Sequence, residues 1–182
     1  MRLFNFIRNG RRKFFKTIVV FLICGLLFLS LPLVVCAGDD DVNNVLLSAE
    51  TLFKSMKEKN YPEVWRFLTA KTKAIIIDDV YAEAVKLSGE YSKEKISSDL
   101  VTGGPIAKAY WDSYLSIFNP DIVLEHSTWK INALKKEYAE INIHYKKSEN
   151  PATLQMFKED GIWKVGLEET FRTRKLMNKF GY

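Results

Sequence analysis

The chain has 182 residues and a formal net charge of +5 at pH 7. Six of its 27 basic residues fall within the first 16 positions, so residues 38–182 keep 21 basic and 22 acidic residues and a net charge of −1. A near-neutral chain has no net positive field, which argues against nucleic acid as a partner. Both cysteines, Cys24 and Cys36, precede residue 38, so disulfides and thiol chemistry are excluded from the remainder.

The first 37 residues predict an export signal. A basic start is followed by an almost wholly apolar stretch, residues 17–35, and then by the small residues Cys36, Ala37 and Gly38. These are the physical requirements of a secretory signal, with the basic end kept in the cytoplasm. We therefore expect the protein to work outside the cytoplasm, in the periplasm or the cell envelope.

Three fates of this segment fit the sequence. Cleavage after Ala37 matches the small-x-small pattern. Lipidation of Cys36 is the second, since residues 33–36 resemble a bacterial lipobox, although Val35 stands where Gly, Ala or Ser is usual. The third is retention as a membrane anchor, because residues 17–35 at about 1.5 Å each reach roughly 28 Å, close to the hydrocarbon thickness.

Helices are predicted in the first part of the remaining chain. Apolar residues recur at helical spacing in four stretches, with Pro62 in the first turn of the second: residues 45–58, 62–68, 76–87 and 106–118. Residues 92–100 are polar and predict only a short helical turn or a loop. Gly103, Gly104 and Pro105 break the chain before the fourth helix.

After Pro120 the apolar period changes to two, which predicts strands. They cover residues 129–133, 139–145, 154–156 and 163–167, with Ile122 to His126 as a further strand at the edge. Short turns make neighbouring strands antiparallel, so we expect a meander with one dry face, with Trp163 in the core. Helices on one face of such a sheet define an α+β fold for residues 38–169. The basic tail, residues 170–182, is either a docked or frayed terminus or a last amphipathic helix.

Two stretches resemble the nuclear-transport-factor-2-like superfamily, the SnoaL-type, cystatin-like cone. They are Ala49 to Leu68 (AETLFKSMKEKNYPEVWRFL) and Met156 to Glu169 (MFKEDGIWKVGLEE). The resemblance implies a curved sheet wrapped around the first helices, with an open cavity at the wide end. The helical stretch from Lys71 to Phe118 departs from the family's commonest pattern. The superfamily includes isomerases, dehydratases and binding modules, so the fold does not choose the function.

No catalytic, metal-binding or cofactor-binding motif is predicted. The two histidines, His126 and His144, have no partner at a metal-ligand spacing, and His144 is expected in solvent. Residues 39–41 are all aspartates and are expected as a solvated segment. Asp112 is expected to point away from the aromatic side of its helix.

Four residues are candidates to line a cavity for an apolar ligand: Tyr110, Tyr114, His126 and Trp129. Aromatic rings supply apolar area, and tyrosine hydroxyls can fix a ligand's orientation. The same spacing also fits plain core residues. His126 shares the parity of Ile122 and Leu124 on the expected edge strand, so it is the candidate for an acid–base role, beside the alternative of a histidine bonded to backbone.

Three functions follow. The leading hypothesis is an exported, non-catalytic module that binds a small apolar molecule or an envelope protein. The second is a cofactor-independent isomerase or dehydratase that uses His126. The third is a structural homodimer formed through the open face of the sheet.

Overall fold

The computed structural model of the protein describes residues 39–87 and 90–171, all within the second of two units into which the chain divides, residues 1–37 and 38–182. The predicted signal, the modification of Cys36, the anchor at residues 17–35 and most of the basic tail lie outside the described residues. Among the described helices, none is long and apolar enough to cross a membrane.

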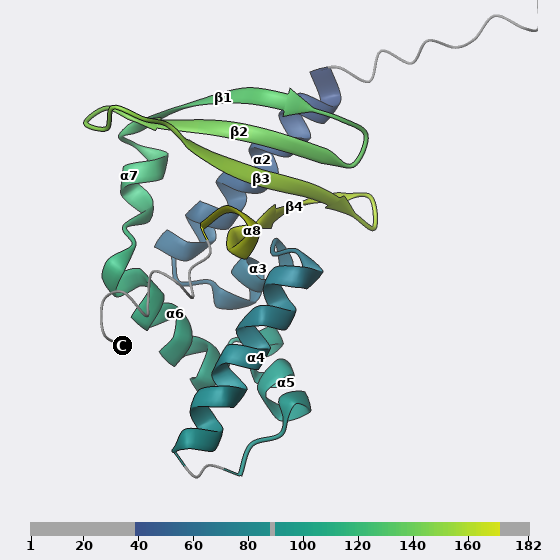
Figure 1. Ribbon diagram of the computed structural model, residues 1–182, viewed down its shortest axis with the longest axis vertical. Helices are drawn as coiled ribbons and strands as arrows, with labels where there is room; N and C mark the ends of the chain where they lie inside the picture. The colour runs from purple at the N-terminus through teal and green to yellow at the C-terminus, as the bar shows by residue number, and fades with distance from the viewer. Residues whose placement is uncertain (1–38, 88–89, 172–182) are drawn as a thin grey trace, which may run out of the picture. The chain divides into compact units, whose positions relative to one another are not determined.

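The predicted α+β class is confirmed, with helices first and strands second (Figure 1). The helices that precede the sheet are α2 (Asp39–Lys57), α3 (Tyr61–Arg66), α4 (Ala70–Lys86), α5 (Lys93–Thr102), α6 (Pro105–Ile117) and α7 (Pro120–Leu124). The strands are β1 (Ser127–Leu134), β2 (Tyr138–Tyr145), β3 (Ala152–Glu159) and β4 (Ile162–Gly166), and the short helix α8 (Leu167–Phe171) follows them.

The four strands form one antiparallel meander in the order β1-β2-β3-β4, as the short turns predict. Alternate residues of β2, β3 and β4 are buried on one face, whereas the inward residues of β1 are half-buried. Trp163, 2% exposed, confirms its place in the core. A bulge in β1 changes one expected position. Ala133 pairs with Glu140, and Leu134 pairs with the buried Ala139, so Leu134 replaces Ala133 on the dry face.

The helices form two groups at different depths below the sheet (Figure 1). Helix α2 packs on β4 and on α7, while α3 joins α2 to α5 and α6. Helices α4, α5 and α6 form a second group on the side of α3 away from the strands. The hydrophobic core therefore lies between the sheet and α2 and extends through α3 into the group of α4, α5 and α6.

The expected edge strand at residues 122–126 is wrong, because Pro120–Leu124 is helix α7. Asn119 caps this helix by accepting a hydrogen bond from the backbone N–H of Asp121 at 2.9 Å, and Pro120 occupies the first turn. The alternation of Ile122 and Leu124 thus belongs to a single helical turn, and His126 follows the helix.

The polar segment after residue 91 is a full helix, α5, where only a turn or loop was expected. The side chain of Ser92 accepts a hydrogen bond from the backbone N–H of Lys95 at 3.3 Å, which starts the helix. Ile96 and Leu100, four residues apart, are both buried against the core. Two apolar positions are therefore sufficient to dock this helix.

Helix α2 is already formed at Asp39, ahead of the expected start near residue 45, and it engages part of the acidic segment that was expected in solvent. Asp41 pairs with Lys158 at 2.9 Å, and the indole N–H of Trp163 points to the same carboxylate at 3.5 Å. The hydrogen bond from Lys158 lowers the pKa of Asp41. This contact joins the start of α2 to β3 and β4.

Candidate ligand-binding pocket

Helix α4 is fixed at its first turn and extends away from the sheet. The hydroxyl of Thr69 accepts the backbone N–H of Thr72 at 3.1 Å and donates to Glu169 of α8 at 3.0 Å. The last turns of α4 leave the core, since Ile76 is 1% exposed and Leu87 is 82% exposed. One apolar side of α4 is therefore not covered by the core.

A tight turn sets α6 against α5. Gly103 ends α5 with φ +73°, a left-handed conformation that favours glycine. Asp99 then caps α6 by accepting the backbone N–H of Ala107 at 2.8 Å. An added Cβ at Gly104 would overlap the carboxylate of Asp99, so a larger residue there would displace the group that caps α6.

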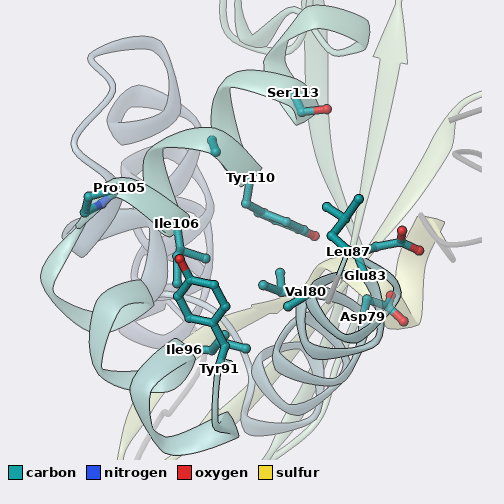
Figure 2. Close-up of a pocket in the computed structure, with 12 residues that line it drawn as sticks. Asp79, Val80, Glu83, Leu87, Tyr91, Ile96, Pro105, Ile106, Tyr110 and Ser113 are labelled. Carbon is teal, nitrogen blue, oxygen red and sulfur yellow. The ribbon is translucent and has the colours of Figure 1, made fainter. Parts of the chain in front are cut away.

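A pocket of about 650 Å³ lies between α4, α5 and α6 (Figure 2). This volume is in the range of small-molecule sites. Helix α4 lines it with Asp79, Val80, Glu83 and Ala84, and Leu87 adds to this wall directly after the helix. The apolar residues of this wall continue the uncovered side of α4 beyond the core.

The opposite wall comes from α6, which contributes Pro105, Ile106, Ala109, Tyr110 and Ser113. The segment before α5 and that helix itself complete the lining with Tyr91 and Ile96. The alanines of α4 and α6 carry only a methyl group, so they leave room between the two helices where larger side chains would meet. Most of the lining is apolar or aromatic.

The two carboxylates of the lining lie on its α4 side, whereas the hydroxyl of Tyr91 lies on the other side, beside Ile106 (Figure 2). In Figure 2 the hydroxyl of Tyr110 extends toward α4, where the carboxylates of Asp79 and Glu83 lie. Burial raises the pKa of Tyr110, and the negative charge of Glu168, the proximity of Tyr114 and the charge of Asp79 raise it further. Tyr110 therefore keeps its proton at physiological pH and can orient a ligand by hydrogen bonding.

Of the four predicted lining residues, Tyr110 lies in this pocket and the other three lie outside it. Tyr114 and Trp129 belong to a series of packed rings that leads away from the pocket wall. The ring of Trp111 meets those of Tyr110 at 5.0 Å and Tyr114 at 5.6 Å. Trp129 reaches the same series through Phe53 and Phe118, and its indole N–H donates to the carbonyl of Val123 at 2.9 Å.

The structure places His126 in solvent, after α7, and its carbonyl accepts the backbone N–H of Lys146 at 3.2 Å. His144 is exposed on the outer face of β2, as expected. Asp112 points away from the aromatic side of α6, as expected, and accepts hydrogen bonds from Tyr61 and Lys59. Among the described residues, no group of histidine, cysteine, aspartate and glutamate side chains is arranged to hold a metal ion.

The α4 side of the pocket and Tyr91 were not predicted from the sequence. The sequence holds one signal for the α4 side, an apolar stripe of Ile76, Val80, Ala84 and Leu87. The core covers Ile76 at one end of this stripe and leaves Leu87 at the other end exposed. Asp79 and Glu83, four residues apart, run beside that stripe. Only their position opposite α6 makes them part of a pocket.

Comparison of the chain with protein-family models, with curated proteins and with solved structures gave no match.

Proposed function

We propose that the protein is an exported, non-catalytic binding module that holds a small, mainly apolar molecule between α4, α5 and α6. The pocket itself carries this proposal, because its volume of about 650 Å³ and its apolar walls suit a small molecule. A few polar groups among the lining residues, the Tyr110 hydroxyl included, would orient the ligand, as is common in small-molecule sites.

The aromatic packing around Tyr110 supports a preformed site. Its ring stands at 88° to that of Trp111, which is fully buried, and Trp111 packs in turn on Tyr114. A pocket wall fixed by the core does not have to be ordered when the ligand binds, which lowers the entropic cost of binding. His126, in solvent and outside the pocket, gives no support to the isomerase or dehydratase alternative.

Native mass spectrometry of the protein isolated from its own envelope fraction tests the proposal. We expect a co-purified small molecule on the wild-type protein. Ala84→Phe fills the pocket and should remove that molecule, because Ala84 lines it. Ala82→Phe is the matched control, since Ala82 lies on the same helix, is exposed and is outside the lining; it should retain the ligand.

The proposal fails if Ala84→Phe carries the same small molecule as the wild type. It also fails if the protein carries none and binds no apolar probe in solution. A second polypeptide, or a dimer mass, that persists in Ala84→Phe would point instead to the envelope-partner or homodimer hypothesis.

We also propose export through residues 1–37 and a relationship to the nuclear-transport-factor-2-like cone. The basic, apolar and small-residue pattern supports the first. Helices packed on an antiparallel meander support the second, in which α4 to α6 would be an addition to a curved sheet that holds α2. The intact mass of the protein in the same sample distinguishes cleavage after Ala37, lipidation of Cys36 and an uncleaved chain. Recovery of the protein from the cytoplasmic fraction alone would contradict export.

A further inference from the structure

We propose that the ligand of the pocket between α4, α5 and α6 carries an uncharged oxygen, as in a ketone or an ether, that accepts a hydrogen bond from the hydroxyl of Tyr110. This inference rests on the proposed function and narrows it to one ligand class. It is drawn from the hydroxyl of Tyr110 and from the charges around the pocket.

The hydroxyl of Tyr110 differs from those of two other tyrosines. Tyr61 and Tyr138 donate hydrogen bonds to the carboxylates of Asp112 and Glu140. In the part of the chain that the structure describes, no group accepts a hydrogen bond from the hydroxyl of Tyr110. Tyr110 lines the pocket, and Figure 2 shows its hydroxyl extending toward α4. This donor is therefore available to a molecule in the pocket.

The position of this donor is fixed by the core. The ring of Tyr110 lies 5.0 Å from that of Trp111 and stands at 88° to it, and Trp111 is fully buried. Burial is the first cause that raises the pKa of Tyr110, so the hydroxyl keeps its hydrogen at neutral pH. A donor held in one place selects ligands whose acceptor lies at the matching point of their apolar body.

The charges around the pocket favour an uncharged acceptor. Glu83 pairs with Lys86 at 2.6 Å, and Asp79 also has an interaction partner, so neither carboxylate needs a cationic group from the ligand. An ammonium group has no lone pair with which to accept the Tyr110 hydrogen. Among the lining residues that the structure describes, none is lysine or arginine, so a ligand carboxylate would find no counter-ion.

The remaining walls accommodate the rest of such a ligand. Val80, Ile96 and Ile106 line the space between the two tyrosines of the pocket (Figure 2). Tyr91, on the other side, is 42% exposed, so water can bond to its hydroxyl. Of the two tyrosine hydroxyls in the lining, that of Tyr110 is therefore the one for which the ligand's acceptor matters.

Compounds with one carbon skeleton test the inference: butylbenzene, and the ketones butyrophenone and 4-phenyl-2-butanone, which carry a carbonyl at different distances from the ring. Titration calorimetry on the protein from the envelope fraction should show that Tyr110→Phe weakens the tighter ketone about fivefold, as expected for one neutral hydrogen bond. Butylbenzene should stay within about twofold, because phenylalanine keeps the ring. The charged analogues 4-phenylbutyrate and 4-phenylbutylamine should bind wild type more weakly than that ketone.

Tyr91→Phe is the matched control, because it removes the other tyrosine hydroxyl of the lining. It should leave the affinity for the ketones within about twofold. An equal effect of Tyr110→Phe on ketone and butylbenzene, a similar loss in Tyr91→Phe, or tighter binding of a charged analogue overturns the inference but leaves the proposed pocket in place. Absence of binding by all the compounds, together with an empty protein in native mass spectrometry, overturns both.

The stability of the empty protein gives a second readout. Tyr110→Phe should keep the thermal midpoint within about a degree of wild type, because it breaks no hydrogen bond of the described fold. Tyr61→Phe, which loses the bond to Asp112, should lower the midpoint by several degrees. A loss in Tyr110→Phe as large as that in Tyr61→Phe would show that the hydroxyl has a partner within the protein, and the inference would fail.

Discussion

Trp163 connects three parts of the molecule through one side chain. It lies on the inner face of β4 and is 2% exposed. Its indole N–H points to Asp41 of α2 at 3.5 Å, and the ammonium of Lys158 lies 5.4 Å from its ring centroid. The ring therefore holds the start of α2 against β3 and β4.

Replacement of this ring by a methyl group should be severe. Trp163→Ala is expected to lower the free energy of unfolding by about 3–5 kcal/mol, since it loses apolar burial and leaves a cavity. That is a large share of the stability of a domain this size. Urea and thermal unfolding measure the loss, and Trp163→Phe, which keeps an aromatic ring, should lose less. A thermal midpoint within about a degree of wild type would contradict this place in the core.

Asp112 is the residue whose ionisation should be visible in stability. The carboxylate of this α6 residue pairs with Lys108 and accepts hydrogen bonds from Tyr61 of α3 and from Lys59. The hydrogen bond from Lys108, followed by those from Tyr61 and Lys59, holds the pKa of Asp112 well below its usual range. Its ionised form is therefore favoured in the folded state.

The direction of the pH effect follows from that lowered pKa. The stabilisation is fully present above the unfolded pKa of about 3.9 and is lost as the pH falls through the lower folded pKa. Asp112→Asn should be less stable than wild type at about pH 7, and the difference should narrow toward about pH 2. Urea midpoints across that range measure it. A difference that stays constant over the whole range would show that Asp112 does not act through its charge.

At the scale of elements, the turn between α5 and α6 determines how the helical group packs. Gly103 has φ +73° and lies against Pro62 of α3, where an added Cβ would stand 2.7 Å from the proline Cδ. Gly161, in the turn between β3 and β4, has φ +78°, and a Cβ added to it would meet no heavy atom within 4 Å outside its own turn. The two glycines share a backbone conformation and differ in their surroundings.

This difference provides a controlled test. Gly161→Ala should cost only the strain of a left-handed conformation, about 1–2 kcal/mol. Gly103→Ala should cost at least about 1 kcal/mol more, because the proline ring cannot move without its backbone. Urea unfolding of both variants measures the two losses. Equal losses would mean that the contact between Pro62 of α3 and Gly103 can open without lowering the free energy of unfolding.

At the scale of the whole molecule, two groups of helices have different roles. Helix α2 covers the sheet and completes its core, whereas α4, α5 and α6 build the pocket on the side of α3 away from the strands. The second group is linked to α2 through α3. It is linked to the sheet through the first turn of α4, where Glu159 of β3 accepts the backbone N–H of Ala70 at about 3.0 Å. The candidate site is thus separate from the face of the sheet, although the same core supports both.

The order of elements, the antiparallel meander and the burial of Trp163 could be predicted from the sequence, because strand alternation and helical spacing are local properties of the chain. Local patterns failed where they were short. Ile122 and Leu124 fit a strand as well as one helical turn, and only the cap at Asn119 decides between them. The bulge in β1 shifts Ala133 through its pairing with β2, which no single strand reveals.

The sequence by itself determined that Tyr110 is an aromatic residue on the apolar side of a helix, and the tertiary structure decided that it faces a pocket while Tyr114 packs in the core. Asp79, Leu87 and Tyr91 join the same site only because α4 extends beyond the core and α6 returns beside it. Spacing along a helix fixes which residues share a side, but what that side meets depends on contacts between segments far apart in the chain.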